Sequence, residues 1–179
     1  MIVLGIDPGS HFTGYGFIEV LEQGERLIEC DVIALDSEQN HQLRLKSVYE
    51  RLCLLNQKHR PALCAVEMPV YGKNPQSMLK LGRIQAAAML AALSLEIPVV
   101  EYTPKQVKKA VTGNGNASKG QVEFMVRSLL AIDDDVKLRH DAFDALAVGL
   151  CHSQRCRAPE MGNQGSWAKF VRENPDRVR

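Results

Sequence analysis

Two carboxylates each close a short apolar run. Asp7 follows residues 2–6, Glu67 follows residues 62–66, and a proline comes within two residues of each acid. An apolar run that stops at such a breaker predicts a buried strand ending in a turn. A carboxylate at the end of a central strand stands at the rim of a sheet, where metals and phosphates bind in such folds. Taken alone, the segment around Asp7 favours the simpler interpretation, in which the carboxylate only hydrogen-bonds its turn. Thr13 is expected either to bond this turn or to reach toward phosphate.

A second pair of acids, Asp141 and Asp144, is expected on the first turn of a helix. Because they lie three residues apart, they project from one face of that helix. Acids complement a helix N-terminus, which is a purely structural reason for their presence. The stretch 142–150 is otherwise apolar, however, so Asp144 is expected to be half-buried and to need a cation, a metal or several donors. The three consecutive aspartates at 133–135 are expected to form a solvated loop.

Together these four acids predict a divalent metal site. Carboxylates that converge without a basic partner repel one another, and hard cations with oxygen ligands, Mg²⁺ in particular, resolve that repulsion. Two such ions about 3.5–4 Å apart would straddle a phosphodiester, one generating hydroxide and the other stabilising the leaving oxygen. The chemistry that the acids imply is phosphodiester hydrolysis.

The elements that must position the acids follow from the hydrophobic periodicity. Three early strands joined by short turns predict an antiparallel meander, and a later strand–helix–strand unit predicts a parallel pair. In chain order we expect strands at 2–6, 12–20 and 26–35, a helix over about 41–58, a strand at 62–66, a helix from 75, a strand at 97–100, short helices from 104 and 119, and a last helix over about 138–153. Helix starts are marked by Asn74-Pro75, Thr103-Pro104 and Ser118 with Gln121. Gly14 and Gly16 would let another backbone or a ligand approach the second strand, and would keep it slim for DNA or a partner strand.

The composition is that of one ordinary globular domain. The 179 residues are 45% hydrophobic and 24% charged. No apolar stretch approaches the ~20 residues of a membrane helix, and no basic region with a cleavage site follows Met1, so we expect a cytoplasmic protein that does not contact membranes. Five cysteines without a CxxC pair indicate reduced thiols. From Arg155 onward six Lys/Arg outnumber three Asp/Glu, which leaves the first 154 residues at −2 of the total of +1. DNA binding would therefore need a local basic patch.

Several motifs, taken in order, resemble those of the bacterial RuvC Holliday-junction resolvases. They are GIDPGS with TGYG (5–16), AVE (65–67), GKN (72–74), LKLG (79–82), KQVK (105–108), GNGNASKGQV (113–122) and HDAFDALA (140–147). The resemblance implies an α/β protein of ribonuclease H-like fold, with a mixed five-stranded sheet flanked by helices. It also implies a homodimer that binds a four-way DNA junction in recombination and repair and nicks two strands symmetrically, since a two-fold dimer suits a two-fold junction. The RuvA–RuvB branch-migration complex is the family's usual partner.

The resemblance assigns roles to individual residues. The catalytic acids that bind Mg²⁺, two ions per site with Mn²⁺ as a substitute, are implied to be Asp7, Glu67, Asp141 and Asp144. Lys108 and Lys119 match residues that contact DNA near the scissile phosphate, and Lys119 at the start of a capped helix suits an anion. Lys105 and Lys109 join them in a local basic patch.

The chain departs from the family three positions after Glu67, where members often carry a phenylalanine proposed to insert at the junction core. Here that position is Val70. Tyr71 comes next and is the candidate for stacking on unpaired bases, with Lys73 nearby as a further DNA-binding candidate. His140 is either an acid/base group close to the acids or a helix-start residue with no such role.

Residues beyond 153 fall outside the resemblance. We therefore divide the chain into a nuclease domain, residues 1–154, and a basic, flexible C-terminal tail, residues 155–179. Two alternative functions remain. An actin- or sugar-kinase-like ATPase also opens with an Asp-Gly strand–turn motif, but it needs a second lobe and an adenosine loop, for which 179 residues leave little room. A junction-binding protein without catalysis would have lost one or more of the four acids.

Overall fold

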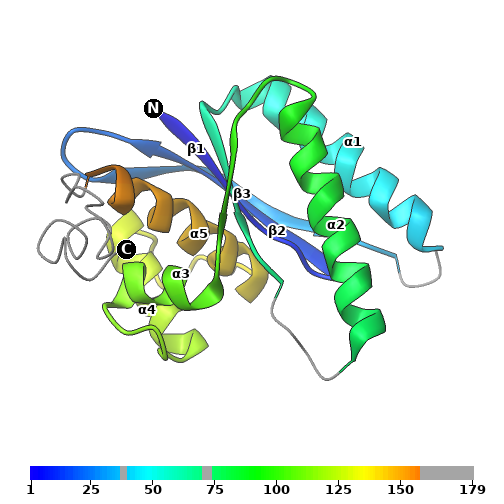
Figure 1. The fold of residues 1–179 in the computed structure, drawn as a ribbon. Helices are drawn as coiled ribbons and strands as arrows, with labels where there is room; N and C mark the ends of the chain where they lie inside the picture. The colour runs from blue at the N-terminus through cyan, green and yellow to red at the C-terminus, as the bar shows by residue number, and fades with distance from the viewer. Residues whose placement is uncertain (37–39, 70–73, 158–179) are drawn as a thin grey trace, which may run out of the picture.

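A computed structural model describes residues 1–36, 40–69 and 74–157 of the 179-residue chain. Within these ranges five strands and five helices follow one another in the order that Figure 1 colours from blue to orange. They are β1 (Ile2–Asp7), β2 (Phe12–Val20), β3 (Glu25–Ala34), α1 (His41–His59), β4 (Leu63–Glu67), α2 (Pro75–Leu93), β5 (Val99–Tyr102), α3 (Pro104–Thr112), α4 (Lys119–Leu130) and α5 (His140–Arg157).

The strands form one mixed sheet in the order β3-β2-β1-β4-β5. β1, β2 and β3 pair antiparallel, whereas β4 runs parallel to β1 and β5 runs parallel to β4. The predicted meander, the parallel pair and the mixed five-stranded sheet are confirmed. The last strand, expected at 97–100, is instead Val99–Tyr102, because its pairing with β4 continues as far as Glu67 and Tyr102.

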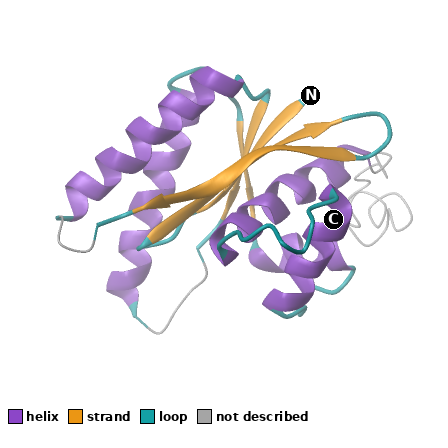
Figure 2. Ribbon diagram, turned by 180° about the vertical axis from the view of Figure 1, so that it is seen from behind, coloured by secondary structure: helices purple, strands orange, loops and turns teal. Residues whose placement is uncertain are grey.

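Helices cover both faces of the sheet. α1 and α2 lie on one face, and α5 lies against the other with α3 and α4 packed on it (Figure 1), and Figure 2 shows the same layers from behind. The side chains of successive residues of β1 point to opposite faces of the sheet, as the pleat of a strand requires. Leu4 and Ile6 are buried in the core beneath α1 and α2, and Val3 is buried in the core beneath α5.

The backbone of α5 packs directly against the backbone of the sheet. A Cβ at Gly5 would stand 2.0 Å from the Ala145 carbonyl oxygen, and one at Gly14 would stand 1.9 Å from the Asp141 carbonyl oxygen. Only glycine allows this approach. The close approach predicted at Gly14 and Gly16 is therefore confirmed, with a helix as the neighbour. The expectation that these glycines keep the strand slim for DNA or a partner strand is wrong, because α5 occupies that space.

The predicted helix starts are confirmed. The Asn74 side chain accepts hydrogen bonds from the first N–H groups of α2, and Thr103 and Ser118 each form a capping box. α5 ends later than expected, at Arg157 rather than near Ser153. The guanidinium of Arg157 donates to two carbonyls of the β2–β3 turn, at 2.7 and 2.6 Å, which ties down the extra turn. No helix within the described ranges has the length and apolarity to cross a membrane.

Candidate active site

Asp7 and Glu67 lie side by side at the carboxyl ends of two adjacent parallel strands. β1 and β4 are paired in register up to Ile6 and Val66, so the acids that follow are neighbours at the edge of the sheet. Each carboxyl group lies close enough to the other to change its pKa. The predicted rim position of both strand-end acids is confirmed.

The surroundings raise the pKa of both carboxyl groups. Burial, followed by repulsion from Asp144, raises the pKa of Asp7 to about 6. Burial, followed by repulsion from Asp7, raises the pKa of Glu67 to about 8. Lys119 acts on both pKa values in the opposite direction, but it is a smaller influence. At neutral pH the pair therefore holds a proton, and any metal that binds must displace it.

α5 contributes the other two acids. The carboxylate of Asp144 accepts a hydrogen bond from Lys119 Nζ at 3.2 Å, and its side chain is 22% exposed. The half-buried carboxylate with a cationic partner that the sequence predicts is thereby confirmed. Asp141, one turn earlier, lies 3.7 Å from Arg139 Nε. Its charge also contributes to the raised pKa of Asp7, whereas the charge of Asp144 raises the pKa of both Asp7 and Glu67.

Three of the four acids line one cavity. Asp7, Glu67 and Asp144 share a hollow of about 240 Å³ with Lys108 and Lys119. Asp141 is not among its lining residues. Over the described residues, no three acidic, histidine or cysteine side chains stand close enough together to chelate a single ion. The donors nevertheless fit a hard divalent cation, because three carboxylates face one cavity and burial already makes the charge of two of them unfavourable.

The predicted lysines fall into two groups. Lys108 on α3 and Lys119 at the first position of α4 line the acidic cavity. Lys105 joins Lys108 in lining a second cavity, of about 490 Å³. Lys109, on the last turn of α3, is exposed and lines neither of these two cavities. The structure therefore places two of the four lysines in the cavity of the acids, and a third in a cavity that also contains Lys108.

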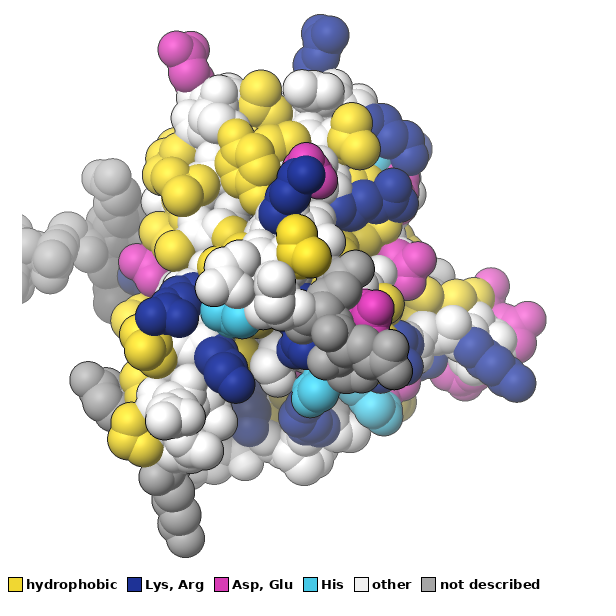
Figure 3. Space-filling view, turned by 90° about the vertical axis from the view of Figure 1, so that its right-hand side faces the viewer, with side chains coloured by type: hydrophobic (Ala, Val, Ile, Leu, Met, Phe, Trp, Pro, Cys, Tyr) yellow, Lys and Arg dark blue, Asp and Glu magenta, His cyan; other side chains and the backbone are white. Residues whose placement is uncertain are grey.

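The remaining DNA-binding candidates, Tyr71 and Lys73, lie outside the described residues, as does the departure from the family at Val70. One face of the molecule is nonetheless rich in positive charge. In Figure 3, Lys and Arg side chains are spread over the upper right and the lower half of the surface, His side chains lie mainly in the lower half, and hydrophobic side chains gather at the upper left. Basic groups spread over one face suit a phosphate backbone.

Arg139 is a residue near the site that sequence reasoning does not single out. Its guanidinium carbon lies 3.6 Å from the centre of the Phe12 ring, and the ring holds the cation beside Asp141. The only signal in the sequence is a basic residue two positions before an acid, and this pattern is too common to predict a role in the site. His140, by contrast, points Nδ1 at Glu123 at 3.1 Å and is 76% exposed, which favours its interpretation as a helix-start residue.

The turn after Asp7 is fixed by a buried hydroxyl. Thr13 is fully buried, and its Oγ1 donates a hydrogen bond to the carbonyl oxygen of Gly9 at 3.4 Å. Of the two roles expected for Thr13, the structure shows the bond to the turn. This bond holds the loop that leads away from the strand-end carboxylate.

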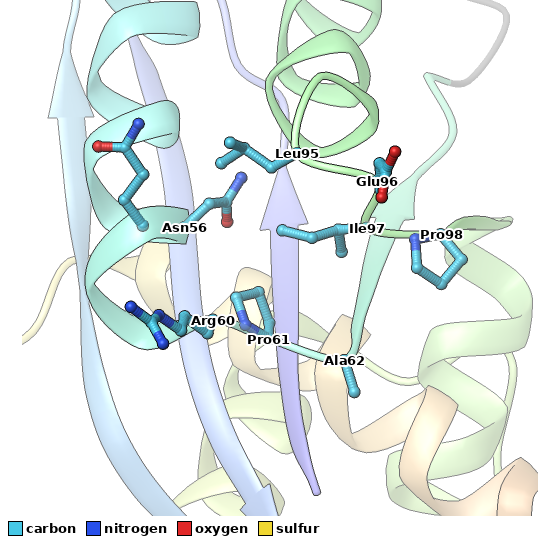
Figure 4. Close-up of a pocket in the computed structure, with 9 residues that line it drawn as sticks. Asn56, Arg60, Pro61, Ala62, Leu95, Glu96, Ile97 and Pro98 are labelled. Carbon is cyan, nitrogen blue, oxygen red and sulfur yellow. The ribbon is translucent and has the colours of Figure 1, made fainter.

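A larger cavity lies at the opposite end of the same strands. It has a volume of about 550 Å³ and is lined by Asn56, Arg60, Pro61, Ile97 and their neighbours, which come just before β4 and β5 (Figure 4). Glu96 is the single acid among its lining residues. Size alone does not make a catalytic site, and the convergent titratable groups lie at the carboxyl ends of the strands.

The sheet is mixed, and two adjacent strand ends and the final helix carry four carboxylates beside a basic surface. This combination defines a class of protein, the nucleases of ribonuclease H-like fold. Comparison with known proteins identifies the family. The family model described as crossover junction endodeoxyribonuclease RuvC matches residues 3–152. The chain therefore belongs to the RuvC family of crossover junction endodeoxyribonucleases, which are metal-dependent enzymes. The predicted family, enzyme class and ribonuclease H-like fold are confirmed.

Relatives match along almost the whole chain. The crossover junction endodeoxyribonuclease RuvC of Salinibacter ruber is 53% identical over 99% of both chains, and that of Porphyromonas gingivalis is 45% identical over 99% of this chain and 97% of its own. The structure of Thermus thermophilus RuvC superposes with a TM-score of 0.79 at 31% identity, covering 88% of this chain and 96% of that one. The same protein in complex with a Holliday junction substrate gives a TM-score of 0.81 at 32% identity, covering 88% and 95%.

Proposed function

We propose that the protein resolves four-way DNA junctions in recombination and repair by paired, symmetric nicks. The observation that carries the proposal is the cavity in which carboxylates from β1, β4 and α5 meet lysines from α3 and α4. Acids alone would repel a phosphodiester, and lysines alone would only bind it. A related RuvC of known structure has been solved with a Holliday junction substrate, which supports the choice of substrate.

Asp7, Glu67 and Asp144 would hold Mg²⁺, with Asp141 reaching the same ion or a second one, and Mn²⁺ would substitute. The bound ions would supply an activated water and would stabilise the leaving oxygen. Lys119 is placed to neutralise Asp144 and to meet a phosphate oxygen, because its ammonium group already lies within hydrogen-bond distance of that carboxylate. Lys108 lines the same cavity and adds a second positive charge for the DNA backbone.

The most direct test of this proposal compares substrates. The protein with Mg²⁺ is expected to nick a synthetic four-way junction at paired positions and to leave a linear duplex of the same sequence largely intact. ATP hydrolysis measured in the same samples should stay at background, as should nicking by an Asp7→Asn variant. An Asp133→Asn variant, which changes an exposed aspartate of the loop before α5, is the matched control and should retain full activity. Intact junctions, or equal nicking of the linear duplex, would refute the proposal.

We also propose that two copies associate through the outer face of α2. Leu79, Leu90 and Leu93 are 57%, 57% and 50% exposed, and they follow one another at helical spacing. On the same helix, Met78, Leu79 and Ala86 line an apolar hollow of about 510 Å³. Exposed leucines aligned on one helix are typical of an association surface. A two-fold dimer would present two equivalent active sites to a two-fold junction.

A charge placed on this face tests the dimer. Leu90→Glu is expected to turn the dimer into a monomer in analytical ultracentrifugation. The matched control is Leu54→Glu on α1, because Leu54 is equally exposed, at 59%, and lies on another helix. A Leu90→Glu variant that still sediments as a dimer would contradict this assignment.

We further propose a cytoplasmic location and an interaction with the RuvA–RuvB complex, for which family membership is the only support. Stimulation of nicking by added RuvA–RuvB would test the interaction, and its absence would count against it.

A further inference from the structure

The last turn of α5 carries a thiol next to an imidazole. Cys156 is exposed, and its Sγ lies 3.2 Å from Nε2 of His152, one turn earlier on the same helix. The other ring nitrogen, Nδ1, lies 2.7 Å from the hydroxyl oxygen of Tyr102 at the end of β5. His152 and Tyr102 are 8% and 3% exposed, so the imidazole is held in place from the inside while the sulfur faces solvent.

This arrangement is that of an activated nucleophile. A nucleophilic side chain lies within hydrogen-bond reach of a base, and a third group orients the base. Burial, with a contribution from Arg155, lowers the pKa of His152, so at neutral pH the imidazole is uncharged and can accept the thiol proton. The guanidinium of Arg155, the residue before Cys156, lies 5.5 Å from the centre of the Tyr102 ring.

The other cysteines lack this environment. Burial raises the pKa of Cys64 to about 12 and those of Cys30 and Cys151 to about 11. Cys53 is partly buried and faces the Ala91 carbonyl oxygen at 3.9 Å rather than an imidazole. All five cysteines lie in the described part of the chain, and among them only Cys156 is exposed. The nuclease chemistry does not use this group, because Asp144 lies twelve residues away, about 18 Å along the helix.

We propose that Cys156 is a modification site for low-molecular-weight disulfides, with His152 and Tyr102 as its positioning residues. The thiol proton moves to His152 Nε2, and the thiolate attacks one sulfur of the incoming disulfide. A new bond forms between Cys156 Sγ and that sulfur while the disulfide's own S–S bond breaks. The departing thiolate then takes the proton from the imidazolium, so that the Cys156 sulfur is oxidised, the departing sulfur is reduced, and no further oxidant is needed.

The probe is oxidised glutathione, applied to the full chain, with the rate of mixed-disulfide formation at each cysteine followed by mass spectrometry. We expect Cys156 to react at least tenfold faster than Cys53, which serves as the internal control. His152→Gln should lower the rate at Cys156 about tenfold, and Tyr102→Phe should lower it by a smaller factor. Cys156→Ser should abolish labelling at this position and leave junction nicking unchanged.

Tyr102→Phe removes only a hydroxyl group, so it keeps the test decisive if His152→Gln does not fold, as judged by circular dichroism. A rate at Cys156 that neither variant changes would overturn the proposal, because exposure alone would then explain the reactivity. Labelling of Cys53 as fast as Cys156 would overturn it as well. Neither result bears on nicking, so this inference stands or falls separately from the proposed nuclease function.

Discussion

Replacing Glu67 by glutamine should stabilise the metal-free protein at neutral pH while it destroys nicking. The native Glu67 carboxyl group has its pKa raised from 4.5 to about 8, so at pH 7 it carries a proton that the unfolded chain has lost. Taking up that proton costs about 1.36 kcal/mol for each pH unit above 4.5, or about 3 kcal/mol at pH 7. Glutamine resembles the protonated acid and avoids this cost.

The sign of the effect gives the prediction a pH signature. A carboxyl group whose pKa is raised by folding does not destabilise the protein below pH 4.5, and it destabilises it progressively as the pH rises toward 8. The variant and the natural protein should therefore have similar free energies of unfolding near pH 4.5 and differ by about 3 kcal/mol at pH 7. Because Glu67 and Asp7 share the proton, the difference belongs to the pair.

The assay is urea unfolding in EDTA at pH 4.5 and pH 7, followed by circular dichroism. Glu50→Gln is the control, because Glu50 is 58% exposed and its pairing with Lys46 is worth at most about 1 kcal/mol. Addition of Mg²⁺ should stabilise the natural protein and have less effect on Glu67→Gln. A stability difference that is the same at both pH values, or a variant less stable at pH 7, would refute the assignment of a buried shared proton.

Three further perturbations follow from the geometry. Lys119→Ala should lower kcat for junction nicking about 10²–10³-fold with little change in circular dichroism, and unchanged kcat would exclude Lys119 from the reaction. Gly14→Ala should destabilise the protein by about 1–3 kcal/mol or more in urea unfolding, because the new Cβ would collide with the Asp141 carbonyl, whereas Gly82→Ala, which meets open space, should be neutral or stabilising. Arg139→Gln should reduce the dependence of log K for junction binding on log salt by about 1, and an unchanged slope would mean that Arg139 touches no phosphate.

Local sequence signals were enough to predict the parts of the site that depend on one element. The strand-end positions of Asp7 and Glu67 follow from apolar runs that stop at breakers, and the structure places the two acids next to each other. The capped starts of α2, α3 and α4 follow from single side chains, such as Ser118, that satisfy free N–H groups. Each of these signals lies within a few residues of the feature that it predicts.

The features that sequence reasoning missed depend on contacts between distant segments. That α5 presses its backbone onto Gly14 is decided by how the helix lies on the sheet, and the sequence shows only a permissive glycine. The extra turn up to Arg157 exists because residues about 130 positions away accept its hydrogen bonds. Arg139 reaches the site by stacking on Phe12, a pairing across the fold that no periodicity reveals.

The measurement that tests the central claim most directly is nicking of a four-way junction by the natural protein and by Asp7→Asn, with binding of the junction recorded in parallel. If the carboxylates hold the divalent ions of a nuclease, the natural protein will nick in Mg²⁺ and not in EDTA, and Asp7→Asn will bind the junction but not nick it. Nicking in EDTA, or nicking by Asp7→Asn at the natural rate, would contradict the claim.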